Sequence, residues 1–271
     1  MTPEECLKQG DLNKALQLLQ EVVRKNPASS EHRVFLFQLL SILGQWDRAL
    51  TQLNVAADLD AGALAMKMMY GQVLNCEALR EKVFQGECEP VVFGKPQEWV
   101  ALLLQALKLS ATGEIGKSDE VRARAFEDAP SISGEIDGQP FDWIADADSR
   151  LGPVMEAVIE GRYLWIPFHN IKSIVIEPPE DLRDMVWIPA HFDWVNGGES
   201  YGLIPTRYPE SYRQSDPLIA LSRKTEWEEL SQDLFVGYGQ KLLTTNSADY
   251  PILDVRVIQL NSPDVDEGSD G

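Results

Sequence analysis

The first 130 residues carry apolar positions at helical spacing. Between residues 12 and 23, four apolar side chains recur at i, i+4, i+7 and i+11, on one face of a helix: Leu12, Leu16, Leu19 and Val23. Thr2-Pro3-Glu4-Glu5 is a capping-box pattern with proline at the first helical position, so a helix is expected to begin there. Similar patterns predict further helices over about 30–44, 63–84, 96–113 and 117–128. The whole segment is therefore expected to be helical.

Two stretches of this segment resemble each other. GDLNKAL at 10–16 recurs as GQWDRAL at 44–50, an offset of 34 residues, which is the period of the tetratricopeptide repeat (TPR). Ala15 and Ala49 occupy the position where that repeat needs a small side chain between its two helices. Leu19 and Leu53 follow at the large apolar position. The offset predicts antiparallel helix pairs stacked as an all-α, TPR-like superhelix over residues 1–129.

After Pro130 the pattern changes to short β-rich runs bounded by turn residues. Asp137-Gly138 and Asn196-Gly197 each separate two such runs, which predicts two β-hairpins. Further strands are expected over 162–168, 172–177, 235–245 and 252–260, and short helices over 154–159 and 225–230. We expect an α+β domain over 130–260 with mostly antiparallel strands, and a disordered acidic tail over 261–271.

Charge and cysteine content narrow the function classes. The chain has 43 acidic and 24 basic residues, a formal net charge of −19, which disfavours binding to nucleic acid or to an anionic membrane surface. The three cysteines form no C-x-x-C pair and suit free thiols in a reducing compartment. The N-terminus lacks the apolar core of a signal peptide and no apolar run is long enough to span a bilayer, so a cytoplasmic protein is expected.

The segment WIADADSRLGP at 143–153 offers the strongest candidate for catalysis. Asp146 and Asp148 follow an apolar run, as in the nucleophile loop of haloacid-dehalogenase-type phosphatases, but Arg150 stands where that family has Thr or Val. A calcium loop starting at Asp146 fails at its fifth, sixth and twelfth positions. The interpretation favoured here is structural: the two carboxylates cap a helix turn at Gly152-Pro153 or accept hydrogen bonds from Arg150.

Other chemistry-bearing residues form no recognisable site. His32, His169 and His191 are scattered, and His191-x-Asp193 has no third ligand at metal-binding spacing. The chain contains no G-x-S-x-G, Walker-type or H-E-x-x-H motif. Neither a cofactor nor a catalytic residue is therefore predicted.

Long strings in the second half resemble one family closely. They are FDWIADADSRLGPVMEAVIEGRYLWIPF, PEDLRDMVWIPA, LIPTRYPES, RKTEW and GYGQKLL, with LREKVFQGECEPVVFGKP and AFEDAP upstream. They are similar to the ImpE/SciE/TagJ family of accessory proteins of bacterial type VI secretion systems. The dense part of the resemblance spans residues 75–260, and the TPR-like start fits the N-terminal region of that family. Lys241 departs from it, since arginine is expected there.

The resemblance implies a cytoplasmic, non-enzymatic adaptor of the contractile sheath. Family members are associated with a helix near the N-terminus of the small sheath subunit, TssB, and with sheath handling by the ClpV ATPase. The alternative is a metal-dependent phosphatase that uses Asp146 and Asp148. A third class, the TPR clamp for carboxylate tails, needs Lys and Arg in its groove.

The repeat register predicts which side chains line such a groove. In TPR stacks the first helix of each pair lines the concave face, and these helices are expected to begin near Ser30 and Leu64. The predicted partner-binding residues are Glu31, Val34, Gln38, Ser41, Ala65, Met68, Gln72 and Asn75. This set contains no Lys or Arg, so it fits an amphipathic helix better than a carboxylate tail. The alternative is that this face binds no partner and is covered by the C-terminal domain or by solvent.

Overall fold

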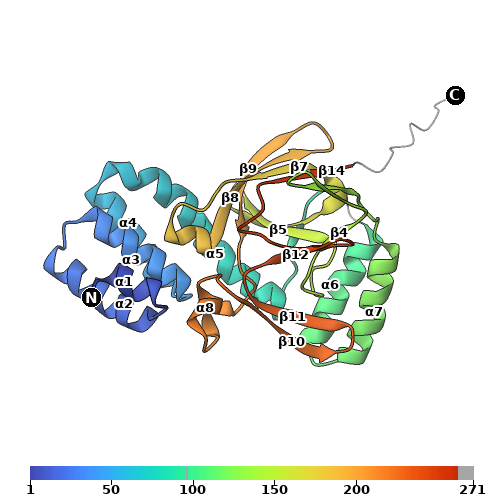
Figure 1. Ribbon diagram of the computed structural model, residues 1–271, viewed down its shortest axis with the longest axis horizontal. Helices are drawn as coiled ribbons and strands as arrows, with labels where there is room; N and C mark the ends of the chain where they lie inside the picture. The colour runs from blue at the N-terminus through green and yellow to red at the C-terminus, as the bar shows by residue number, and fades with distance from the viewer. Residues whose placement is uncertain (96, 262–271) are drawn as a thin grey trace.

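The structure, a computed structural model, describes residues 1–95 and 97–261 (Figure 1). A helical first part is followed by a strand-rich second part, as the two hydrophobic patterns predict. Of the expected acidic tail only Asn261 lies within the described residues. Among the residues described, no helix is long and apolar enough to cross a membrane.

Within the described residues, seven α-helices lie before residue 130. They are α1 (Pro3–Lys8), α2 (Leu12–Lys25), α3 (Ser30–Ile42), α4 (Trp46–Leu59), α5 (Leu64–Phe84), α6 (Glu98–Ala111) and α7 (Ile115–Asp128). The capping box at the start of α1 is confirmed: the Thr2 amide donates to the Glu5 carboxylate at 2.8 Å, and the Glu5 amide donates to the Thr2 hydroxyl at 3.3 Å. The predicted small positions, Ala15 and Ala49, are fully buried.

The helices form two groups rather than one continuous stack. α1–α4 lie together at one end of the molecule, α5 runs between them and the sheet, and the α6–α7 hairpin lies beside the sheet at the other end (Figure 1). The third predicted repeat unit, 63–84, is a short 3-10 turn (Ala61–Ala63) followed by a single 21-residue helix. The boundary of a separate helical domain at residue 129 stays a prediction.

The second part contains one large sheet. Its strand order is β1-β6-β5-β9-β8-β7-β14-β2-β3. The bounds are β1 (Val91–Val92), β2 (Gly134–Ile136), β3 (Gln139–Phe141), β5 (Val154–Ile159), β6 (Arg162–Pro167), β7 (Ile171–Ile176), β8 (Trp187–Trp194), β9 (Glu199–Pro205) and β14 (Val257–Leu260). Neighbouring strands pair antiparallel except β1 with β6. The hairpins predicted at Asp137-Gly138 and Asn196-Gly197 are β2–β3 and β8–β9, so both are confirmed.

Smaller elements complete this part. A three-stranded sheet holds β13 (Asp249–Pro251), β12 (Leu242–Thr245) and β4 (Ile144–Asp146), and a separate hairpin joins β10 (Thr225–Ser231) to β11 (Leu234–Gly239). The remaining helical pieces are η2 (Phe168–Asn170), η3 (Leu182–Met185), η4 (Ser211–Arg213) and α8 (Pro217–Ala220). The run predicted as one strand over 235–245 is therefore two strands in different sheets, broken near Lys241.

Two predicted short helices are wrong. Residues 154–159 form β5, which lies between β6 and β9 and is buried on both faces, so its apolar residues run on without alternating. Residues 225–230 belong to β10, where hairpin pairing with β11 overrides the low strand propensity of three glutamates. Each segment pairs with the strand that follows it in a hairpin, and β5 pairs in addition with the distant strand β9.

Two apolar cores lie on the two faces of the large sheet. One joins α1–α7 to side chains such as Val158, Trp165 and Trp187. The other lies on the opposite face, where Ile188, Phe192 and Ile204 meet residues of the three-stranded sheet. The first core extends from the helices into the sheet, and α5 lies at its centre.

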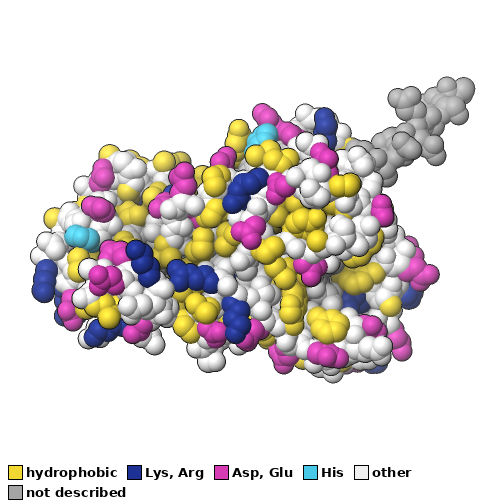
Figure 2. All heavy atoms as spheres, viewed as in Figure 1, with side chains coloured by type: hydrophobic (Ala, Val, Ile, Leu, Met, Phe, Trp, Pro, Cys, Tyr) yellow, Lys and Arg dark blue, Asp and Glu magenta, His cyan; other side chains and the backbone are white. Residues whose placement is uncertain are grey.

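Contacts near residue 44 fix the helices to the second part. Gly44 ends α3 with a positive φ of 65°, which glycine adopts without strain. A β-carbon there would lie 2.4 Å from the Tyr212 ring, so the close approach also requires glycine. Figure 2 shows basic and acidic side chains over both parts of the visible face.

Candidate functional site

The structure divides the predicted groove residues into two sets. The four on α5, Ala65, Met68, Gln72 and Asn75, are exposed and form one stripe along the helix. Met68 is the most exposed large apolar side chain of this stripe, at 74%. These four side chains stand together on an accessible surface.

The set on α3 is mostly covered. Glu31 is exposed, and Val34 is half-buried against an alanine cluster that includes Ala56. Gln38 and Ser41 are buried. The assignment of all eight residues to partner binding stays a prediction, and within the described chain the accessible part of the set is the α5 stripe with Glu31.

Later parts of the chain cover the C-terminal half of α3. The Arg207 guanidinium donates to the Ile42 carbonyl at 2.7 Å and to the Ser41 carbonyl at 2.8 Å. It also donates to the Ala220 carbonyl at 2.6 Å, and η3 packs against α3. Because the last carbonyls of a helix have no partner within it, this contact satisfies the end of α3.

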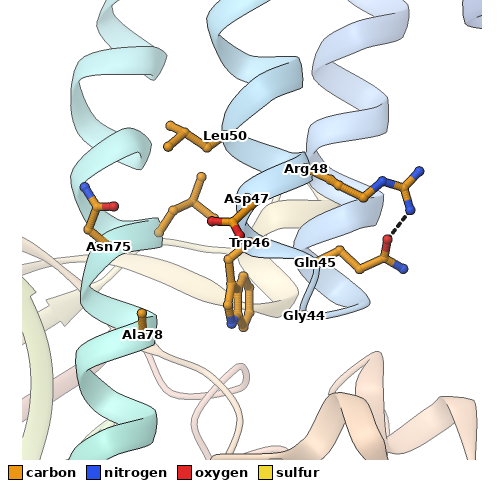
Figure 3. Close-up of a pocket in the computed structure, with 9 residues that line it drawn as sticks. Gly44, Gln45, Trp46, Asp47, Arg48, Leu50, Asn75 and Ala78 are labelled. Atoms are coloured by element: carbon orange, nitrogen blue, oxygen red, sulfur yellow. Dashed lines mark hydrogen bonds between the residues drawn. The ribbon is translucent and has the colours of Figure 1, made fainter.

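Two clefts flank the α5 stripe. The first, of about 440 Å³, lies between α4 and α5, with Trp46 and Leu50 on one side and Asn75 and Ala78 on the other (Figure 3). The second, of about 370 Å³, lies between α5 and strands β5, β8 and β9, and Gln72 lines it. The stripe is thus bordered by hollows on both sides, where a partner's side chains can be buried.

Asp148 lies at the turn after β4 and is fully buried. Its carboxylate accepts two hydrogen bonds from the Arg150 side chain, at 2.9 and 2.6 Å, and one from the Gly237 amide at 2.9 Å. The interpretation that Arg150 binds this carboxylate is confirmed. The expected helix turn after Gly152-Pro153 is wrong, because that turn leads into β5.

Asp146 belongs to a buried ion network formed by Arg80, Asp146, Glu156 and Lys241. Lys241 donates to Asp146 at 2.6 Å and to Glu156 at 2.9 Å. Arg80 binds both oxygens of Glu156, at 2.7 and 2.9 Å. All four side chains are almost completely buried, so each charge depends on its partners rather than on water.

Hydroxyl and indole groups complete the coordination of these carboxylates. Tyr208 donates to Asp146 at 2.9 Å, and Tyr163 donates to Glu156 at 2.6 Å. Trp165 donates in turn to the Tyr163 hydroxyl at 2.7 Å. Every carboxylate oxygen of Asp146, Asp148 and Glu156 accepts a hydrogen bond from the protein.

Opposing effects of burial and charge set the pKa values in the network. Burial raises the pKa of the Asp146 carboxyl to about 6, although Lys241 acts in the other direction. Burial also acts to raise the pKa of Glu156, but Arg80 and Lys241 outweigh it and hold that pKa well below its usual range. The two carboxylates hold the pKa of Lys241 above its usual value against the effect of burial. The network is therefore ionised at neutral pH.

This geometry does not resemble a phosphoryl-transfer site. The strands around Asp146 pair antiparallel, whereas the phosphatase alternative expects a parallel sheet. A magnesium ion would have to displace Lys241 from Asp146 and Arg150 from Asp148. The arrangement supports a structural role for both aspartates.

We expect Asp148→Asn to lower the free energy of unfolding by about 2–3 kcal/mol, because an amide cannot accept the paired, charge-assisted bonds from Arg150. Urea titration measures the loss, with the exposed Asp193→Asn as control. Magnesium-dependent hydrolysis of phosphate esters by the wild type that disappears in Asp148→Asn would contradict the structural role.

The fold also assembles a cluster that sequence spacing did not suggest. His191 Nε2 lies 3.1 Å from a Glu199 oxygen, and Asp193 lies beside them on the β8–β9 hairpin. The register of the hairpin was not used in the sequence analysis, and this register pairs Asp193 with Glu199 across the turn at Asn196-Gly197. An ordinary surface hydrogen bond between His191 and Glu199 accounts for this arrangement.

Comparison with known proteins shows the family of this chain. The model of the ImpE protein family matches residues 138–259, and a tetratricopeptide repeat model matches residues 7–73. The type VI secretion system accessory component TagJ of Pseudomonas aeruginosa is 45% identical over 264 residues, 97% of this chain and 92% of that protein. The chain belongs to the TagJ family. This TagJ-family chain also shares its fold with protein VPA1032 from Vibrio parahaemolyticus, whose crystal structure matches with a TM-score of 0.88 at 23% identity, over 96% of this chain and 98% of that one.

These likenesses confirm the family and the fold class that the sequence predicts: a TPR-like helical part followed by a strand-rich, mostly antiparallel part. Membership of the TagJ family relates the chain to an accessory component of type VI secretion, which supports an accessory role.

Proposed function

We propose that this TagJ-family chain is a non-enzymatic, cytoplasmic adaptor that binds a helix near the N-terminus of the small sheath subunit, TssB. Through that subunit it acts in sheath handling by ClpV, which it contacts indirectly. The family resemblance supplies the partner. The structural observation that supports binding is the exposed α5 stripe around Met68, with a cleft on either side.

The α5 stripe suits a helical partner better than a charged peptide tail. Ala65, Met68, Gln72 and Asn75 combine small, flexible apolar and neutral polar groups, which adapt to the ridges of a helix. Polar groups elsewhere in the second part, such as Asp146 and Asp148, are already bonded within the protein. Binding through α5 therefore requires no rearrangement of the buried network.

Calorimetric titration with the purified small sheath subunit tests this proposal. The wild-type chain is expected to bind the whole subunit and not a version that lacks the N-terminal helix. Met68→Ser is expected to weaken binding about tenfold, since truncating a central anchor costs about 1.4 kcal/mol. Leu230→Ser, at a 43% exposed position on β10, is the matched control and should bind as the wild type. Equal affinity for the truncated subunit would refute the proposal.

A further inference from the structure

The cleft between α5 and the sheet has walls from both parts of the chain. Met69, Gln72 and Val73 of α5 form one wall, and Pro189 and Tyr201 lie on the sheet side. On this side of the sheet, α5 covers inner side chains such as Leu203 but leaves the outer ends of β8 and β9 uncovered. In Figure 1 these ends form the top edge of the molecule.

A row of one valine, one histidine and one tyrosine crosses the uncovered sheet face. Register places Val175 of β7, His191 of β8 and Tyr201 of β9 side by side. Tyr201 is 77% exposed and Val175 is 40% exposed, while the His191 and Tyr201 rings lie 4.5 Å apart. Val175, Tyr201 and Met69, which is 53% exposed, therefore place apolar side chains at the surface, where a solvated sheet face usually carries polar ones.

Acidic side chains border this surface. Glu160 and Glu177 line the cleft, and Asp193 and Glu199 form the next row of the sheet, with side chains 41% and 69% exposed. No Lys or Arg is among the residues lining the cleft in the described chain. Arg162 pairs with Glu160 at 3.3 Å, but both are exposed, so solvent screens that pair.

We propose that this cleft binds an amphipathic helix whose apolar anchors are flanked by Lys or Arg. The anchors occupy the hollow between Met69 and Tyr201, and the flanking cations meet Glu160, Glu177 and Glu199. Charge complementarity favours this occupant over an acidic or neutral helix and speeds its capture by a chain of net charge −19. The inference rests on the proposed function, because it specifies the chemistry of the sheath-subunit helix.

Two synthetic helical peptides test the charge preference on the full chain. Both carry leucines at i, i+3, i+4 and i+7, one with lysines and the other with glutamates at the flanking positions. Fluorescence anisotropy is expected to show binding of the lysine peptide at least tenfold tighter than binding of the glutamate peptide. Raising the salt concentration from about 0.1 M to about 1 M, which shortens the Debye length from about 10 Å to about 3 Å, should remove most of that difference.

Single substitutions test whether the lysine peptide binds in this cleft. Tyr201→Ser and Glu199→Lys are each expected to weaken binding of the lysine peptide at least fivefold. Glu229→Lys makes the same charge change on β10, at the opposite edge of the molecule, and should alter binding less than twofold (Figure 1). Circular dichroism confirms that each variant is folded. Equal binding of both peptides, or a Tyr201→Ser variant that binds as the wild type, would overturn the inference.

Two further results separate this inference from the proposed function. If the small sheath subunit does not bind the wild type while the lysine peptide still depends on Tyr201, the partner assignment fails and the cleft chemistry stands. If the subunit binds and Glu199→Lys and Tyr201→Ser leave that binding unchanged, the cleft inference fails and the adaptor role stands. Self-association in sedimentation velocity that Tyr201→Ser abolishes would identify a second copy of the chain as the occupant and overturn the inference.

Discussion

Replacing Arg80 by methionine is expected to lower the free energy of unfolding by about 3–5 kcal/mol, the usual cost of removing one partner of a buried ion pair. Arg80 is the cation by which α5 reaches the sheet: it binds Glu156 through two hydrogen bonds and the Arg207 carbonyl through a third, at 3.0 Å. Methionine fills similar space and offers no donor, so Glu156 keeps its charge with Lys241 as its remaining cation. Most single domains are stable by only about 5–15 kcal/mol, so the loss is large.

Urea unfolding followed by circular dichroism measures this loss. Arg162→Met is the matched control, because Arg162 also pairs with a glutamate but is 63% exposed. Its effect should stay within about 0.5 kcal/mol. A loss below about 1 kcal/mol for Arg80→Met would mean that Lys241 and Tyr163 alone stabilise the Glu156 charge.

Replacing Lys241 by methionine is expected to cost about 3–5 kcal/mol at pH 8 and less at pH 5. The variant leaves Asp146 and Glu156 buried without the cation that they share. The pKa of Asp146, already about 6 in the folded protein, rises further once Lys241 is gone. A carboxyl whose folded pKa exceeds its unfolded value of about 3.9 takes up a proton more readily when folded, so stability is lost as pH rises through the folded pKa.

The comparison needs urea titrations of wild type and variant at both pH values. Lys241→Arg keeps the cation, and it should therefore lose less stability than Lys241→Met and show less dependence on pH. Lys224→Met, at a half-exposed ion pair on the surface, controls for loss of a lysine. The same loss at pH 5 and pH 8 would show that Asp146 does not become protonated when Lys241 is absent.

Local sequence patterns predicted the helices and hairpins that depend on residues close together in the sequence. The 34-residue offset fixed the register of α1–α4, and the Asp-Gly and Asn-Gly pairs marked two hairpins, because each of these features depends on neighbouring residues. The helix predicted for Val154–Ile159 is wrong, because this segment pairs with β6, which follows it in a hairpin, and with β9, which begins at Glu199 far along the chain. Its central residue, Glu156, binds a side chain 76 positions earlier.

The candidate site shows the same limit. Met68 was predicted as a groove residue from repeat spacing alone, and it is exposed on α5. Gln38 and Ser41 followed from the same spacing, but Arg207 and η3 come from far along the chain and cover this part of α3. The cleft beside Tyr201 was not predicted, because it exists only where α5 meets the end of a hairpin more than 100 positions later.

The contact between Arg207 and α3 has a consequence for synthesis on the ribosome. The Arg207 guanidinium donates to the carbonyl of a residue 165 positions earlier in the chain. The ribosome therefore completes α3 long before it adds Arg207. At translation rates of about 5–20 residues per second, the interval lasts roughly 10–30 s. During that time the nascent chain lacks Arg207 and η3, which cover the C-terminal end of α3 at Ser41 and Ile42 in the finished protein. Molecular chaperones that hold exposed apolar helices therefore have a defined segment, and a defined interval, in which to act on this chain.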